Sequence, residues 1–287
     1  MIRLALLLLA ASVGVAGNPA AESTQAPADP PSRVVALAPH LAELVFAAGA
    51  GERLAGVTAY TDHPPAAAAL PRIGDAFRVD MERIAVIDPD LVLAWEGGTP
   101  KALTGRLREL GYRVTVIRTG SVEDVAAAIR RIGEQLGTAE TADRAAGEFL
   151  RELEAAVAGH ADARPLRVFY QVASRPLYTV NGGHYISELI RLCGGRNVFS
   201  DLDELAPVVT VESVLSRDPE VILAPAGEPG VLERWQAWRS LAAVRAGNLR
   251  TVPPDTLARP SPRLVQGAAD ICAAIETSRR RLSAAPP

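Results

Sequence analysis

The chain has 287 residues, a length that suits one or two globular domains. Its composition is that of an ordinary, alanine-rich globular protein, because hydrophobic residues make up a typical 48%. The net charge of −3 argues against a general nucleic-acid-binding protein, since such proteins carry an excess of basic residues.

Residues 1–17 are predicted to form a secretory signal peptide. They contain the apolar run LALLLLAASVGVA, and Gly14 and Ala16 have the small-x-small spacing of a cleavage site. The alternative, an uncleaved membrane anchor, is disfavoured because a membrane span needs about 20 apolar residues. Residues 18–32 are rich in Ala, Pro and Ser and predict a disordered leader. We therefore expect a soluble, exported protein.

Residues 33–137 alternate strand and helix patterns and are predicted to form an N-terminal α/β lobe with a parallel sheet. Ligands of such sheets bind beyond the carboxyl ends of the strands. Tyr60 and Trp95 both lie in loops that follow predicted strands, so a binding role is as well supported as a packing role. The expected strands are residues 34–37, 54–57, 91–94 and 113–117, and the expected helices are residues 40–49, 102–110 and 121–136.

Residues 138–161 carry the longest uninterrupted helical pattern and are predicted to form a linker helix. Its apolar residues recur at helical spacing and make one stripe. Thr138 is the expected N-cap, and Gly159 suits the helix end.

Residues 162–287 are predicted to form a second, similar lobe. ERIAVIDPDLVLA at residues 82–94 matches ESVLSRDPEVILA at residues 212–224, and AELVFAAG at residues 42–49 matches SELIRLCG at residues 187–194. Two matches in the same order favour an internal repeat. The alternative is the general likeness of helix-then-strand units. The closing helix is expected over the range 264–282.

The chain contains two cysteines, Cys193 and Cys272. In an exported protein an even number of cysteines favours a disulfide over two buried thiols.

The sequence shows no pattern typical of an enzyme. A phosphate loop, a nucleophile elbow and a marked pair of catalytic carboxylates are all missing. The four histidines, His40, His63, His160 and His184, lack the spacing of a strong metal site. We therefore predict neither catalysis nor a bound metal.

Glu82 and Glu212 occupy the same position in the repeat, each in the first turn of a short predicted helix. The helix dipole would stabilise either carboxylate by roughly 0.3–1 kcal/mol, and this is the simple explanation. As a pair, the two side chains would also suit a partner with two basic pockets.

Four blocks of the sequence carry a family resemblance. They are VVALAPHLAELVFAAGAGERLAGVTAYTDHPP, GDAFRVDMERIAVIDPDLVLAWEGG, RPLYTVNGGHYISELIRLCGGRNVF and RPSPR. Together they resemble the periplasmic vitamin B12-binding proteins of bacterial ABC importers, over about residues 33–274. The wider class of helix-bridged substrate-binding proteins also includes haem, siderophore and metal binders.

The resemblance implies two Rossmann-like α/β lobes joined by one rigid helix, with a corrinoid in the cleft between them. It implies a monomer in the periplasm of a Gram-negative type of cell, without a resident cofactor. Glu82 and Glu212 would dock onto the permease dimer, and Cys193 and Cys272 would form a disulfide. The implied ligand-binding residues are Tyr60, Asp62, Phe77, Trp95, Glu96, Tyr178, Arg259 and Arg263.

The chain departs from the family pattern at two positions. Some relatives carry Trp near Ala76 and near Ala206, and Phe77 is a one-residue shift from the first of these. The missing aromatic area leaves the identity of the corrinoid open. Two alternatives remain: a haem or ferric-siderophore carrier of the same fold, and a secreted α/β enzyme.

Overall fold

The computed structural model describes residues 29–75, 78–160 and 163–284. The predicted signal peptide, most of the predicted leader and Phe77 lie outside the described residues. Within the described ranges, no helix is both long enough and apolar enough to cross a bilayer.

The N-terminal lobe is built on a four-stranded parallel sheet with the order β2-β1-β3-β4. The central strands read as continuous apolar runs because helices cover both faces of the sheet, and their residues are buried. The elements are β1 (Val34–Ala36), α1 (Pro39–Ala47), η1 (Gly51–Arg53), β2 (Leu54–Val57), α2 (Pro65–Ala68), α3 (Met81–Ile87), β3 (Leu91–Trp95), α4 (Lys101–Glu109), β4 (Val114–Ile117) and α5 (Val122–Gln135).

The C-terminal lobe repeats this plan. Its parallel sheet has the order β8-β5-β9-β10. In this order β8 corresponds to β2, β5 to β1, β9 to β3 and β10 to β4 of the first sheet. This equivalence confirms the predicted repeat. The elements are β5 (Leu166–Tyr170), β6 (Ala173–Ser174), β7 (Leu177–Tyr178), α7 (Tyr185–Leu192), β8 (Gly195–Asn197), α8 (Val211–Arg217), β9 (Val221–Pro225), η2 (Glu233–Ala237), α9 (Ala242–Arg245), β10 (Leu249–Val252) and α10 (Leu264–Ala284).

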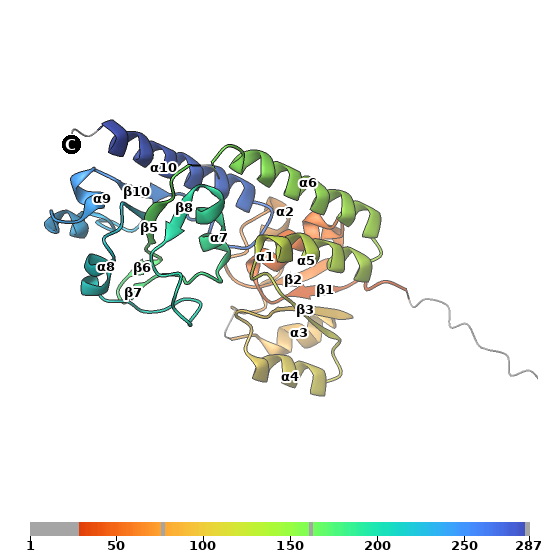
Figure 1. The fold of residues 1–287 in the computed structure, drawn as a ribbon. Coiled ribbons are helices and arrows are strands. Elements are labelled where there is room, and N and C mark those ends of the chain that lie inside the picture. Colours follow the sequence, from red (N-terminus) through yellow and green to blue (C-terminus); the bar gives the residue numbers. More distant parts are fainter. Residues whose placement is uncertain (1–28, 76–77, 161–162, 285–287) are drawn as a thin grey trace, which may run out of the picture.

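Helix α6 (Ala139–Val157) connects the two lobes along one side of the molecule (Figure 1). Its buried stripe includes Phe149 and Leu153, and the helix packs against α5 of one lobe and α10 of the other. The helix ends at Val157, before the predicted boundary at residue 161, and Gly159 follows with a left-handed φ of 80°.

Two expectations about the helices need qualification. Thr138 occupies the N-cap position of α6, as expected, but its side chain makes no capping hydrogen bond. Its backbone N–H donates to the Gly133 carbonyl at 2.8 Å. In addition, α10 is longer than α6, with 21 residues against 19.

A duplicated polar anchor explains why the two lobes have the same local geometry. In the first lobe, Arg33 at the start of β1 donates to the Asp88 carbonyl at 2.8 Å and pairs with the Asp88 carboxylate at 3.0 Å. Asp88 ends α3 in the left-handed region, with a φ of 47°, a conformation that Asp tolerates. Asp90 then accepts the backbone N–H of Arg33 at 2.9 Å.

The second lobe has the same anchor. Arg167 at the start of β5 donates to the Asp218 carbonyl at 2.8 Å and to its carboxylate at 3.3 Å. Asp218 ends α8 with a φ of 40°, and Glu220 accepts the N–H of Arg167 at 2.9 Å. In both lobes the anchor joins the first strand to the turn between a short helix and the next strand.

The predicted disulfide is present. Cys193, at the end of α7, is bonded to Cys272 in α10 across 79 residues. In the chain-entropy model, closing a loop of this length contributes about 4 kcal/mol to stability. The bond fastens the C-terminal helix to the centre of its lobe.

We expect Glu220→Gln to reduce the dependence of stability on pH. Burial raises the pKa of Glu220, but hydrogen bonds from Arg164 and from the Arg167 N–H outweigh it and hold the pKa below its ordinary value of 4.5. A lowered carboxyl pKa stabilises the fold at neutral pH, and this contribution is lost as the pH falls through the folded-state value.

Urea unfolding at pH 7 and pH 3 measures the effect. The variant should be less stable than wild type at pH 7, and the two proteins should approach each other at pH 3. Glu154→Gln, on the exposed face of α6, is the control. Parallel pH profiles for wild type and Glu220→Gln would contradict the assignment.

Candidate functional site

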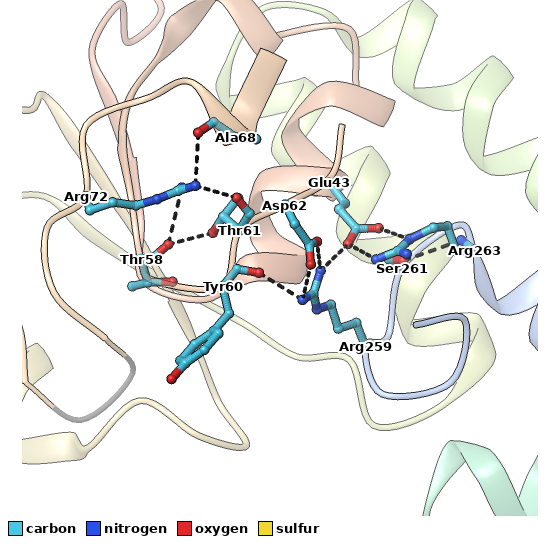
Figure 2. A network of polar contacts seen from close by, with 10 residues as sticks. All are labelled: Glu43, Thr58, Tyr60, Thr61, Asp62, Ala68, Arg72, Arg259, Ser261 and Arg263. Carbon is cyan, nitrogen blue, oxygen red and sulfur yellow. Dashed lines mark hydrogen bonds and ion pairs between the residues drawn. The ribbon is translucent and has the colours of Figure 1, made fainter. Parts of the chain in front are cut away.

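The carboxyl ends of the two parallel sheets meet at the loops that follow β2 and β10. Arg259, seven residues after β10, reaches the loop after β2 and donates to the Tyr60 carbonyl at 2.8 Å. It also forms a two-pronged pair with Asp62, in which the Nη2–Oδ2 distance is 3.1 Å (Figure 2). These contacts join the C-terminal lobe to the N-terminal lobe.

The electrostatics of this pair favour its charged form. Hydrogen bonds from Arg259 lower the pKa of Asp62 below its ordinary value, and the same hydrogen bonds raise the pKa of Arg259. The pair therefore remains ionised at neutral pH.

A buried carboxylate lies behind this pair. Glu43, in α1, has a side chain that is 3% exposed, and it accepts hydrogen bonds from Arg263 at 2.7 and 3.0 Å (Figure 2). Arg259 lies 3.5 Å from the same carboxylate. The guanidinium of Arg263 therefore contacts the N-terminal lobe, and its predicted contact with a ligand stays a prediction.

The loop after β2 is fixed by side-chain hydrogen bonds to its backbone carbonyls. Arg72 donates to the Thr61 carbonyl at 2.7 Å and to the Ala68 carbonyl at 3.0 Å, and the Thr61 hydroxyl donates to the Thr58 carbonyl at 2.9 Å. Tyr60 has a left-handed φ of 64°, and 80% of the residue is exposed. Figure 2 shows its ring pointing away from the network, free to contact another molecule.

Trp95 ends β3 and lies partly buried. Its backbone N–H donates to the Thr99 hydroxyl at 2.9 Å, and its ring meets His40 edge-on at 4.9 Å. A Cβ at Gly97 or Gly98 would come within 2.8 or 2.3 Å of the indole, so the two glycines allow the ring to lie across this loop. Glu96 is exposed and lies 4.0 Å from Arg118.

His40 is buried beneath Trp95 and is uncharged at neutral pH. Burial, followed by the positive charge of Arg259, lowers the pKa of His40 to about 3. Across the described part of the chain, no three His, Cys, Asp or Glu side chains are grouped so that they could hold a metal ion.

Tyr178 lies in the opposite lobe, in the short antiparallel pair β6–β7. It also bridges to Val208, so the segment around Val208 extends this hairpin. The structure brings together Tyr60, Asp62 and Arg259, places Trp95 and Tyr178 on separate lobes, and does not describe Phe77.

Comparison with known proteins identifies the family. The family model described as periplasmic binding protein matches residues 34–256. The chain belongs to this family. It is 32% identical, over 253 residues, to a vitamin B12-binding protein of Vibrio cholerae serotype O1, covering 88% of this chain and 92% of the relative. It is 34% identical to a vitamin B12-binding protein of Pectobacterium atrosepticum, covering 84% and 88% of the two chains.

Solved structures agree with the family assignment. The periplasmic vitamin B12-binding protein BtuF of Vibrio cholerae matches with a TM-score of 0.80 at 32% identity, covering 88% of this chain and 99% of that one. The periplasmic heme-binding protein RhuT of Roseiflexus sp. RS-1 matches with a TM-score of 0.76 at 22% identity, covering 86% and 98%, which shows a shared fold. The α/β fold with two parallel-sheet lobes is therefore that of the periplasmic binding proteins.

In this periplasmic binding protein, Glu82 and Glu212 are displayed in the same way. Each is exposed in the first turn of a short helix, α3 or α8, that begins at a capping side chain and ends at a left-handed Asp. The pKa of Glu212 is lowered by hydrogen bonds from its own N–H and from Thr210. In Figure 1, α3 and α8 lie on the sides of their lobes away from α6 and α10.

Sequence reasoning missed two residues that join the lobes. Glu43 pairs with arginines of the C-terminal lobe, and Glu188 of α7 accepts the Val122 N–H of α5 at 3.0 Å. Burial raises the pKa of Glu188. The two glutamates occupy the same position in the repeated segments AELVFAAG and SELIRLCG. This shared position is the feature of the sequence that could have identified them.

We expect Glu43→Ala to lower the free energy of unfolding by about 3–5 kcal/mol, because removing one partner of a buried ion pair leaves the other charges uncompensated. Glu109→Ala, which removes the exposed partner of Arg106, should cost about 1 kcal/mol or less. Urea unfolding of the two variants tests this. Equal losses would mean that Glu43 acts as an ordinary surface charge.

Proposed function

We propose that this protein captures cobalamin or a related corrinoid in the cleft between its lobes and delivers it to the permease of an ABC importer. The observation that carries the proposal is the likeness, over most of the chain, to vitamin B12-binding proteins and to a solved structure of one. The family assignment supports a periplasmic location, and we propose that residues 1–17 direct export.

The chemistry of the cleft suits such a cargo. A corrin has broad apolar faces and a rim of amides, so aromatic rings and a few polar groups can hold it without a ligand to cobalt. The exposed ring of Tyr60 and the ring of Trp95 would contact the corrin from one lobe, and Tyr178 from the other. Asp62 and Arg259 lie beside Tyr60 and would hydrogen-bond to the amide rim.

The remaining predicted ligand-binding residues are also proposed to contact the cargo. Glu96 and Phe77 would complete the side of the cleft near Trp95, although Phe77 lies outside the described residues. Arg263 would act at the edge of the site, since its guanidinium is bound to Glu43. We propose a monomer with lobes at residues 33–137 and 162–287, a linker at residues 138–161, no resident cofactor and no catalysis.

Glu82 and Glu212 are the proposed contacts with the permease. Each is a carboxylate at the start of a short exposed helix, and the repeat gives the two sites the same local geometry. Two basic pockets on a dimeric permease would meet both carboxylates at once, and this would fix the orientation of docking.

Haem is the second candidate cargo. The observation that favours it is the exposed phenol of Tyr60, because a tyrosine oxygen can bind haem iron. The shared fold with heme-binding proteins is compatible with this reading.

We expect cyanocobalamin to bind the purified mature protein one-to-one with a submicromolar Kd in isothermal titration. Trp95→Ala and Tyr60→Ala should each weaken binding about tenfold or more, because each removes one aromatic contact with the corrin. Haemin is titrated alongside. Haemin binding with a Soret band, together with no binding of cobalamin, would assign haem as the cargo. If neither ligand binds, the proposal is overturned.

We expect the double variant Glu82→Ala, Glu212→Ala to keep its affinity for cyanocobalamin and to lose transport. The two carboxylates lie outside the cleft, so their removal affects docking alone. The measurement is cobalamin-dependent growth of a strain that lacks its own binding protein and produces the matching permease. Glu154→Ala on α6 is the control, and normal growth with the double variant would contradict the docking role.

A further inference from the structure

A recess with a volume of about 610 Å³ lies beside α7, and we call it the α7 recess. Its size is typical of a small-molecule site. Ser121 lines it from the N-terminal lobe, and residues of the C-terminal lobe form its other walls. Most of these residues belong to α7 and to the edge strand β8, which pack against each other (Figure 1).

The α7 recess is separate from the candidate cargo site. Pro165 directly precedes β5 and Gly195 begins β8, so the recess extends toward the amino ends of these strands. The candidate cargo site lies at the carboxyl ends of the two sheets. Among the described residues, none of the candidate cargo contacts lines the recess.

The internal repeat relates the α7 recess to a smaller recess beside α1. Glu188 of α7 occupies the position that Glu43 occupies in α1. Ser121 directly precedes α5 as Arg263 directly precedes α10, and the strands before these two helices, β4 and β10, correspond. Glu43 and Arg263 line the smaller recess, which has a volume of about 210 Å³. The two recesses are therefore equivalent places in the two halves of the molecule.

In the smaller recess the protein supplies its own cation. Arg263 donates to both carboxylate oxygens of Glu43, at 2.7 and 3.0 Å. A two-pronged pair of this kind is among the strongest polar contacts in proteins. It shows that a glutamate at this position of the repeat can bind a guanidinium group.

In the α7 recess the corresponding residue is too short to play this part. Ser121 takes the place of Arg263, and its hydroxyl accepts the Asp124 N–H at 3.1 Å at the start of α5. Glu188 lines the recess and accepts the Val122 N–H at 3.0 Å through one oxygen. A guanidinium from outside the chain would therefore find the position that Arg263 fills in the other half.

The charges around Glu188 favour a bound cation. Burial raises the pKa of Glu188, and the neighbouring carboxyl of Glu123 raises it further, whereas the Val122 N–H and the charge of Arg191 act in the opposite direction. Two adjacent carboxyls repel each other when both are ionised. A cation beside Glu188 would relieve this repulsion.

Two arginines give the recess a positive end as well. Arg191, three residues after Glu188, lines the recess at the position that Phe46 holds in the smaller one. Arg196 of β8 also lines it, and both arginines are exposed. Guanidinium groups match the geometry of a carboxylate. A ligand that satisfies both ends therefore carries one cationic and one anionic group.

We propose that the α7 recess binds a small molecule that carries a guanidinium and a carboxylate, as free arginine does. The guanidinium would pair with Glu188, and the carboxylate would meet Arg191 and Arg196. Because Ser121 comes from the other lobe, the bound molecule would add a contact between the lobes. Cyanocobalamin titration tests the proposed cargo separately, since the recess contains none of the described cargo contacts.

Titration of the purified mature protein with three ligands tests this site. L-arginine carries both charged groups, agmatine lacks the carboxylate, and L-citrulline lacks the cation. We expect L-arginine to bind with a Kd of about 1 mM or tighter, and agmatine and L-citrulline to bind about tenfold more weakly or worse. Amide chemical shifts in NMR spectra give the affinities and should change at residues 120–123 and 187–197.

Two variants assign the two charges. Glu188→Gln keeps an acceptor for the Val122 N–H and should weaken the binding of L-arginine about tenfold or more. Arg191→Phe introduces the side chain of the smaller recess, and it should weaken L-arginine binding to the level of agmatine without weakening agmatine. Glu109→Gln, on the exposed surface of α4, is the control and should change neither affinity.

The repeat supplies a third variant. Ser121→Arg introduces the arginine of the smaller recess and should abolish L-arginine binding, because the protein's own guanidinium then reaches Glu188. Ser121→Ala removes the same helix cap without filling the recess, so it should bind L-arginine as wild type does. The site is overturned if wild type does not bind L-arginine, if L-citrulline binds equally well, or if Glu188→Gln and Ser121→Arg keep the wild-type affinity.

Discussion

The buried ion-pair cluster around Glu43 is the interaction on which the shape of the cleft depends. Glu43 comes from α1, and its partners Arg259 and Arg263 come from the last loop of the other lobe. Removing a carboxylate from water costs several kcal/mol, and the cost is offset only while both guanidinium groups stay in place. Any movement that separates the lobes at this end must therefore break the cluster.

A second contact, on the other lobe, uses the equivalent residue. Glu188 holds in α7 the place that Glu43 holds in α1, and it accepts a backbone N–H at the start of α5. The repeat thus supplies each lobe with one glutamate that reaches the other lobe. With α6 packed on helices of both lobes, these contacts limit how far the lobes can part.

The charged groups of the candidate site are gathered where the lobes meet. Asp62 and Arg259 are ionised and paired there, beside the exposed ring of Tyr60. The network thus fixes the loop after β2 against the C-terminal lobe and leaves the phenol of Tyr60 uncovered.

The sequence by itself determined the two-lobed α/β architecture, because buried parallel strands and amphipathic helices leave local hydrophobic patterns. The apolar run at β3 and the matched Asp-Pro segments were both visible in the sequence. The short strand β8 was missed, since Gly195 followed a helix pattern and carried no strand signal. Only the tertiary structure decided that Glu43 meets Arg263, 220 residues away. This pairing depends on how the lobes are placed against each other, and local hydrophobic patterns do not specify that placement.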